Sequence, residues 1–171
     1  MLSIIGAVLV IGASATFGVL SLWRMQTRIR VLSALLTALS YMKSEIADRM
    51  TPIPELIEAL IRESDPPVDR LFRRVAAGMG EIGAQSLYFI WRTAVMDSQE
   101  LELRDTERQS LIDLGRALGR YDAEEQRDAF AYTIRRFEGY LRRAEEERRN
   151  QGRVHAILGI VVGVFVVIIL L

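Results

Sequence analysis

The sequence predicts an all-α protein, a membrane-anchored bundle of about six helices. Three observations support this fold class. No Asp, Glu, Lys or Arg occurs in residues 1–23 or 154–171, although the chain has 22 basic and 22 acidic residues. Between these segments, residues 24–153 repeat their apolar side chains every three or four positions, which is helical spacing. Nothing in that stretch alternates apolar and polar residues as a half-buried strand would.

The first uncharged segment is long enough to be a transmembrane helix. A helix over residues 1–23 would extend roughly 35 Å, and the hydrocarbon core of a bilayer is about 30 Å thick. A secretory signal peptide is the alternative, since Ala13-Ser14-Ala15 has the small-x-small form of a cleavage site. However, no basic residue precedes the apolar run and arginines follow it, which favours an uncleaved anchor.

The second uncharged segment, residues 154–171, is shorter and would fit the bilayer with mild mismatch. A buried core helix is the alternative, but residues 160–171 are apolar on every face, as suits contact with lipid. Basic residues that flank transmembrane helices are retained in the cytoplasm. Here the flanking arginines are Arg24, Arg28, Arg30, Arg142, Arg143, Arg148, Arg149 and Arg153. The sequence therefore predicts one cytoplasmic domain, residues 24–153, between two spans of the cell membrane.

Helix-breaking residues divide the start of this domain into two helices. The first helix continues from the membrane and ends near Met50. Its apolar stripe consists of Ile29, Leu32, Leu36, Leu39, Met42 and Ile46. Thr51 before Pro52 is a capping residue followed by proline at a first helical position. The second helix ends at Asp65-Pro66-Pro67, and its apolar residues are Leu56, Ile57, Leu60 and Ile61.

Three further helices precede the last one. A glycine cluster is expected to end the third helix: Gly78, Gly80 and Gly83. The fifth helix begins near Asp105 and ends before Gly119, and Asp122 with Glu125 has capping-box spacing for the sixth. The expected core residues of the three helices are Val68, Leu71, Phe72 and Val75, then Leu87, Ile90, Trp91, Ala94 and Val95, then Leu111, Leu114 and Leu118.

The sixth helix is the longest, because no residue from Ala123 to Asn150 interrupts it. Its apolar stripe, which matches that of the first helix, is Phe130, Ile134, Phe137, Leu141 and Ala144. We expect these two helices to pack antiparallel as a stalk that is continuous with the N- and C-terminal transmembrane helices.

Composition argues against several kinds of function. The formal net charge is zero, so the chain lacks the long-range field that attracts nucleic acid. Cysteine is absent and His155 is the only histidine, so one chain can form no cysteine zinc site and no serine–histidine–aspartate triad. No glycine-rich phosphate loop occurs. We therefore expect no catalytic residue, no metal and no cofactor.

The remaining candidates are contact residues. Small residues four positions apart let membrane helices pack closely, and the chain has two such pairs: Ser14 with Gly18, and Gly159 with Gly163. Tyr88 and Phe89 flank the expected core residue Trp91, and their aromatic rings are candidates to anchor a protein partner.

Several motifs resemble one protein family over the whole chain. They are Thr51-Pro52-Ile53-Pro54-Glu55-Leu56, Pro67-Val68, Leu71-Phe72 and Leu118-Gly119-Arg120-Tyr121-Asp122. Together with an apolar segment at each end, they are similar to the stage III sporulation protein AB family of endospore-forming bacteria. Residues 52–78 separately resemble the helical domain of the type II secretion F platform protein.

This resemblance implies a scaffold without catalysis in the channel that joins mother cell and forespore. The chain would lie in the outer forespore membrane, face the mother-cell cytoplasm, and dock a cytosolic secretion-type ATPase beside other channel proteins. Platform proteins have duplicated domains and more spans, so a homo-oligomer or a polytopic partner is implied as well. The alternatives are a membrane-anchored helical sensor or regulator, and an enzyme that uses only surface carboxylates and arginines.

Within the scaffold hypothesis, the turn after the fifth helix is a candidate partner surface. A short turn between helices holds its exposed groups in fixed positions, which favours Arg116, Arg120 and Asp122. By contrast, the charged run Glu145 to Arg149 is typical of a solvated helix face.

Overall fold

The computed structural model describes residues 25–80, 85–118 and 123–170. Four of the candidate contact residues lie outside these ranges, namely Ser14, Gly18, Arg120 and Asp122. The packing of Gly159 and Gly163 also lies outside the described residues, because no side chain is described after residue 150. The first predicted span, residues 1–23, therefore stays a prediction, as do the limits of the cytoplasmic domain.

The described residues form six α-helices and no strand, which confirms the all-α fold class. The first helix covers residues 25–43 and ends in a π-helical turn, η1. The elements that follow are η1 (Ser44–Asp48), α2 (Ile53–Glu63), α3 (Val68–Met79), α4 (Leu87–Asp97), the 3₁₀ turn η2 (Gln99–Leu101), α5 (Asp105–Leu118) and α6 (Ala123–Leu170).

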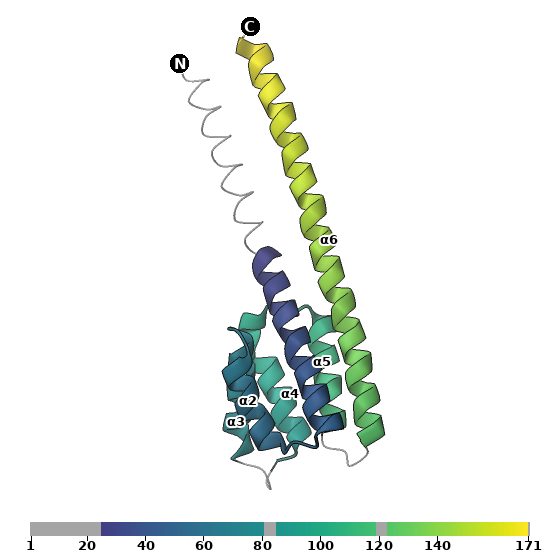
Figure 1. The fold of residues 1–171 in the computed structure, drawn as a ribbon. Coiled ribbons are helices and arrows are strands. Elements are labelled where there is room, and N and C mark those ends of the chain that lie inside the picture. The colour runs from purple at the N-terminus through teal and green to yellow at the C-terminus, as the bar shows by residue number, and fades with distance from the viewer. Residues whose placement is uncertain (1–24, 81–84, 119–122, 171) are drawn as a thin grey trace. The chain divides into compact units, whose positions relative to one another are not determined.

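The chain divides into two compact units, and the helical bundle is the unit Arg30–Leu141. Within the bundle, the first helix runs antiparallel to α6, as its sequence stripe predicts (Figure 1). Pairwise packing follows chain order, since α2 contacts α3, α3 contacts α4, and α4 contacts α5. The other unit comprises Met1–Ile29 and Arg142–Leu171. A search of the described residues for a helix with the length and hydropathy of a membrane span finds none.

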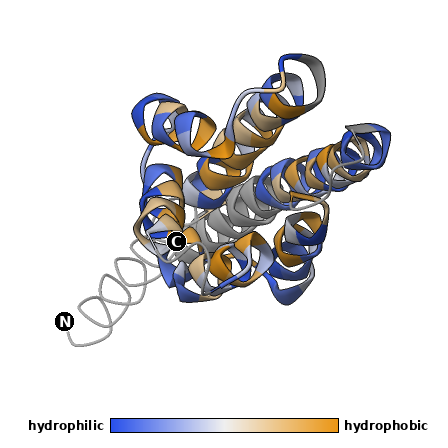
Figure 2. Cartoon of the chain, turned by 90° about the horizontal axis from the view of Figure 1, so that it is seen from below, coloured by the Kyte–Doolittle hydropathy of each residue, from blue (hydrophilic) through white to orange (hydrophobic). Residues whose placement is uncertain are grey.

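Each helix of the bundle turns one apolar face inward, and these faces make the core (Figure 2). Most of the predicted core positions are buried, including all those named for α3 and α4 except Leu87. In the first helix the stripe is rotated slightly, because Val31 and Leu35 are buried while Leu36 is only half-buried. The largest fully buried side chains are Trp91, Phe72, Phe130 and Phe137.

The predicted cap at the start of α2 is wrong. Pro52 is the N-cap residue of α2, and no side-chain hydrogen bond caps this end of the helix within the described residues. Thr51 instead donates its hydroxyl to Glu45 Oε2 at 2.6 Å, and Arg49 donates to Glu45 Oε1 at 2.8 Å. Glu45 is 6% exposed, so its buried carboxylate needs both donors. The Thr51 hydroxyl therefore closes the end of the first helix, and the chain turns at Met50, whose φ is +53°.

The glycine cluster after α3 differs from its predicted role. α3 ends at Met79, close to the expected place, but Gly80 has a right-handed conformation with a φ of −62°. Gly78 lies inside α3, where a Cβ atom would stand 2.6 Å from Ile90 Cγ2. Gly78 thus permits the close approach of α3 and α4, while Gly83 lies outside the described residues.

Candidate functional site

The first turn of α4 and the last turn of α5 meet at one end of the bundle. The guanidinium carbon of Arg116 lies 5.8 Å from the centre of the Tyr88 ring, a cation–π contact. Arg116 also forms an ion pair with Asp113 at 3.3 Å, and its side chain remains 65% exposed. Phe89, next to Tyr88, is 47% exposed. Three candidate partner residues from two separate parts of the sequence are therefore gathered on neighbouring turns.

Two further residues extend this surface along α4, and sequence reasoning missed both. Arg92 and Met96 are exposed, and they follow Phe89 at steps of three and seven residues, so they lie on the same side of the helix. The same helical spacing that identifies the core would have found them. We refer to Tyr88, Phe89, Arg92, Met96 and Arg116 as the α4–α5 surface.

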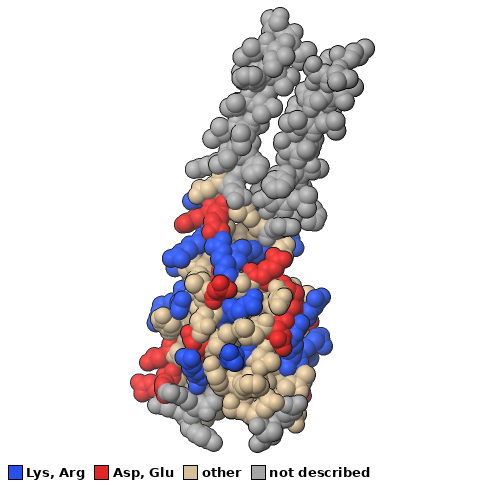
Figure 3. Space-filling view, turned by 180° about the vertical axis from the view of Figure 1, so that it is seen from behind, with Lys and Arg blue, Asp and Glu red and all other residues tan. Residues whose placement is uncertain are grey.

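In Figure 1, α4 and α5, the two helices that carry the α4–α5 surface, are drawn behind the first helix. Figure 3 looks onto the bundle from that side. Toward the lower end of the view, uncharged side chains gather in one area, and Lys or Arg side chains lie above and beside them (Figure 3). Exposed apolar side chains beside arginines, as Phe89 and Met96 beside Arg92, are typical of a surface that binds protein.

A capping hydrogen bond fixes where α4 begins. Ser86 is the N-cap residue, and its hydroxyl oxygen accepts a hydrogen bond from the Phe89 backbone N–H at 3.3 Å. The exposed Phe89 ring therefore stands on the first, capped turn of the helix. Tyr88 on the same turn is half-buried, since its ring faces Arg116.

The opposite face of α4 is held by Trp91, which is 1% exposed and so confirms its predicted place in the core. The indole N–H donates to the backbone oxygen of Leu111 at 2.6 Å. The indole ring also lies against Gly115, where an added Cβ atom would stand 2.4 Å from Trp91 Cδ1. On the other side, the Phe72 ring of α3 is 6.5 Å from the Trp91 ring. α4 is thus fixed between α3 and α5.

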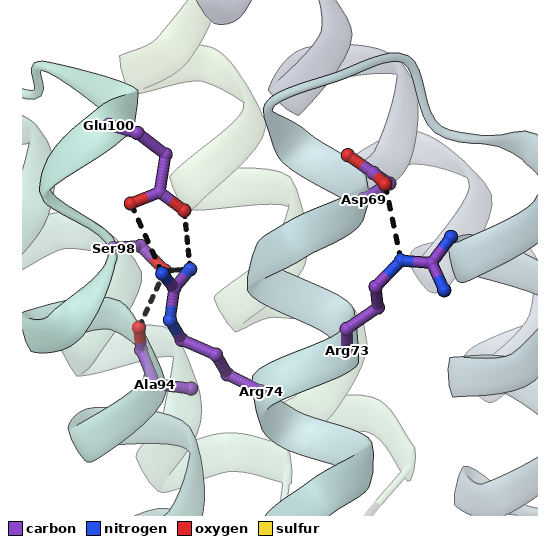
Figure 4. Close-up of polar contacts among 6 residues, drawn as sticks. All are labelled: Asp69, Arg73, Arg74, Ala94, Ser98 and Glu100. Carbon is purple, nitrogen blue, oxygen red and sulfur yellow. Dashed lines mark hydrogen bonds and ion pairs between the residues drawn. The ribbon is translucent and has the colours of Figure 1, made fainter.

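A polar network joins α3 to the carboxyl end of α4 (Figure 4). Arg74 donates to Ser98 Oγ at 3.1 Å and forms a two-pronged ion pair with Glu100. The Ser98 hydroxyl in turn donates to the Ala94 backbone oxygen at 2.7 Å. Figure 4 also shows the separate Asp69–Arg73 pair, which lies within α3 at 3.3 Å.

Glu100 is ionised more readily than a free glutamate. Burial alone would raise the pKa of Glu100, but the Arg74 hydrogen bond opposes burial, together with a hydrogen bond from the Glu100 backbone and the charges of Arg74 and Arg70. The net effect is a pKa below the ordinary value. Glu100 therefore stays charged through the neutral range and keeps α3 and η2 joined.

A second polar network joins α5 to α6 around the Tyr140 hydroxyl. The Tyr140 O–H donates to the Thr106 backbone oxygen at 3.2 Å. The phenolic oxygen accepts from Arg136 Nε–H at 3.1 Å and lies 3.1 Å from Ser110 Oγ. The Arg136 guanidinium also lies over the rings of Tyr132 and Tyr140. Burial would lower the pKa of Arg136, but its contacts with Tyr140 and Tyr132 raise it instead.

Other features of the described residues offer less for ligand chemistry. No group of three or more His, Cys, Asp or Glu in this part of the chain could hold a metal ion. A hollow of about 260 Å³ on α6 is lined by Arg142, Glu145, Glu146 and Arg149. It is broadly open to solvent and lined only by charged side chains, whereas small-molecule sites are enclosed and mostly apolar. The α4–α5 surface is therefore the strongest candidate site.

Comparisons with known proteins agree on one family. A family model described as stage III sporulation protein AB matches residues 3–171. A solved structure titled stage III sporulation protein AB is similar to 72% of this chain and 98% of its own, with a TM-score of 0.67 and 22% identity. At that identity the structural likeness supports the fold alone. A search of curated protein sequences finds no match.

Proposed function

The chain belongs to the stage III sporulation protein AB family, and from this premise we propose that it is a membrane-anchored scaffold without catalysis of its own. It serves a secretion-like channel that joins the mother cell and the forespore. Its bundle faces the mother-cell cytoplasm, and the α4–α5 surface receives a cytosolic secretion-type ATPase. The other channel proteins bind elsewhere on the same assembly.

The proposal of two membrane anchors rests on the sequence at the two ends. Residues 1–23 and 154–171 contain no Asp, Glu, Lys or Arg, and arginines flank them on the sides that face the bundle. In this arrangement the bundle is held at the outer forespore membrane, and a partner on the cytoplasmic side meets its helix ends.

The proposal of ATPase docking rests on the Tyr88–Arg116 contact. Interface hot spots are enriched in Tyr, Trp and Arg that stand on rigid supports. The Tyr88 ring and the Arg116 guanidinium hold each other at 5.8 Å, and Phe89 lies exposed beside them. Because α4 is clamped by Trp91 on its other face, these three side chains are already positioned before a partner arrives.

The test is recovery of the ATPase with the full-length protein. The tagged chain is extracted in mild detergent from sporulating cells, and co-purified proteins are quantified by mass spectrometry. The variants are Arg116→Glu and Tyr88→Ala, and the control is Arg135→Glu, which reverses an exposed arginine on α6. We expect the wild-type chain and the control to recover a secretion-type ATPase. The amount of ATPase recovered with each of the two variants should be at least about fivefold lower.

Other outcomes overturn the proposal. Absence of the ATPase from the wild-type sample contradicts docking, and recovery of a kinase or a transcription regulator in its place favours the sensor. Equal recovery by all variants places the ATPase on another surface of the bundle. Western blots against the tag, together with the control, separate a lost contact from a lost protein.

A further inference from the structure

The outward face of α4 is apolar and basic along two helical turns. Phe89 is 47% exposed and Met96 is 44% exposed, and a separation of seven residues places them on one side of the helix. Arg92 and Thr93 are exposed between them. Two large apolar side chains at this spacing are the usual footprint of a helix that packs against another helix.

This face is held rigid from behind. Gly78 lets α3 approach Ile90, the Trp91 indole is bonded to Leu111 and lies against Gly115, and Arg74 binds Ser98 just past the last turn. These contacts fix the rotation of α4, so Phe89 and Met96 cannot turn into the core. A partner therefore meets a preformed surface and loses little entropy in ordering it.

Between Phe89 and Met96, the free charge on this face is positive. Arg92 makes no hydrogen bond or ion pair within the described residues. Arg116 has Asp113 as a partner, but both side chains are well exposed, so the pair is solvated and leaves the guanidinium accessible. Electrostatic complementarity selects a partner of opposite sign.

We infer that the α4–α5 surface binds an amphipathic helix with acidic flanks. Its apolar side chains would lie against Phe89 and Met96, and its carboxylates against Arg92 and Arg116. This inference rests on the proposed function, since the ATPase or an adaptor of the ATPase supplies the helix. It adds the chemical nature of the partner segment, which the proposed function leaves open.

A second copy of this chain fits the same face poorly. A two-fold antiparallel pairing that sets Phe89 of one copy against Met96 of the other brings the two Arg92 side chains within a turn of each other. Two unpaired guanidinium groups at the centre of an interface repel each other. A helix with carboxylates at that position removes the conflict, which favours a different partner.

The experiment compares two designed peptides on the full-length chain. The protein is placed in nanodiscs of phosphatidylcholine. This lipid has no net charge, so it exerts no net electrostatic attraction on either an acidic or a basic peptide. The peptides are amphipathic helices of about 18 residues, or five turns, with the same leucine face and with either glutamate or lysine on the flanks. Binding is measured by fluorescence anisotropy in low salt, about 50 mM, where surface charges are weakly screened. Empty nanodiscs provide the background.

We expect the acidic peptide to bind the wild-type chain about tenfold more tightly than the basic one. Arg92→Glu should abolish or invert this preference, and Phe89→Ser with Met96→Ser should weaken both peptides. Arg135→Glu is the matched control, because it makes the same charge change on α6, and should leave the preference intact. Arg92→Gln removes the charge without reversing it, and it should also reduce the preference for the acidic peptide. It serves as the test if Arg92→Glu folds poorly.

The results separate this inference from the proposed function. Equal binding of the two peptides to the wild-type chain, or an unchanged preference in Arg92→Gln, overturns the acidic partner. If the ATPase is still recovered from cells in that case, docking stands and only its chemistry is wrong. If the peptide preference is present but no ATPase is recovered, the surface is real and the ATPase is not its partner.

Discussion

Trp91 and Gly115 lie in direct contact across the α4–α5 interface. A Cβ atom at position 115 would stand 2.4 Å from Trp91 Cδ1 and 3.0 Å from Trp91 Cγ. The indole is fixed in turn by its hydrogen bond to the Leu111 backbone oxygen, at 2.6 Å. Since the ring can neither tilt nor slide without breaking that bond, the glycine sets the distance between the two helices, and with it the separation of Tyr88 and Arg116.

Gly115→Ala should destabilise the bundle by about 1–3 kcal/mol, the usual cost of overpacking a core. In an open helix position the same change would be favourable by up to about 1 kcal/mol, because alanine is the better helix former. Gly139 in α6 is the matched control, since an added Cβ there meets no described heavy atom within 4 Å. Urea unfolding of the full-length chain, followed by circular dichroism, measures both changes. A Gly115→Ala protein as stable as Gly139→Ala would refute the close contact.

Thr51→Ala should cost about 1.5–2 kcal/mol, because it removes a donor from the buried Glu45 carboxylate. Thr51→Ser keeps the hydroxyl and should cost less than about 0.5 kcal/mol. The difference between the two variants isolates the hydrogen bond from the loss of the methyl group. Were the variants equally stable in urea unfolding, the hydroxyl would have no structural role at the end of the first helix.

The helices of the bundle could be predicted from the sequence because their ends carry strong local signals. Pro52 and the Asp65-Pro66-Pro67 break act within a few residues of themselves, so α2 and α3 lie where helical spacing and the breakers place them. The prediction that Thr51 caps α2 is wrong because it, too, used only local sequence. A threonine before proline predicts a cap locally, but a buried glutamate six residues earlier competes for its hydroxyl, and burial is a tertiary property.

The candidate surface was only half predictable. Aromatic side chains beside a core tryptophan indicate Tyr88 and Phe89, and exposed charge near a turn indicates Arg116. That Tyr88 and Arg116 touch depends on how α4 and α5 cross, which Trp91 and Gly115 decide. A glycine inside a helix does not reveal which side chain fills the space above it, so neither the contact nor the clamp behind it follows from local sequence.

Tyr140→Phe should destabilise the bundle by about 1–2 kcal/mol. The change leaves Ser110 and Arg136 without the phenolic oxygen that joins them, and it removes the bond to the Thr106 backbone. Tyr41→Phe is the control, because Tyr41 is 37% exposed and its hydroxyl makes no hydrogen bond within the described residues. Hydrogen exchange adds a local measure, in which the first turn of α5 should lose protection in Tyr140→Phe alone.

The Arg74–Glu100 pair predicts a specific dependence of stability on pH. The folded-state pKa of Glu100 is lower than its ordinary value of 4.5, so the folded state binds the proton less readily than the unfolded state does. The contribution of the Glu100 carboxylate to the free energy of unfolding is therefore fully present above its unfolded pKa. It is lost as the pH falls through its folded pKa. Because the Glu100 side chain is 24% exposed and that of Arg74 is 36% exposed, we expect only about 0.5–1 kcal/mol.

Glu100→Gln tests this sign directly, since glutamine keeps the size and removes the charge. The gap in unfolding free energy between wild type and variant should be constant from neutral pH down to about pH 5, and should narrow below pH 4.5. Glu58→Gln is the control, because Glu58 is 71% exposed and its Arg62 partner is 3.8 Å away, too loose a pair to affect stability measurably. A gap that widens as the pH falls would mean that the carboxylate is disfavoured in the folded state and that Arg74 does not hold it.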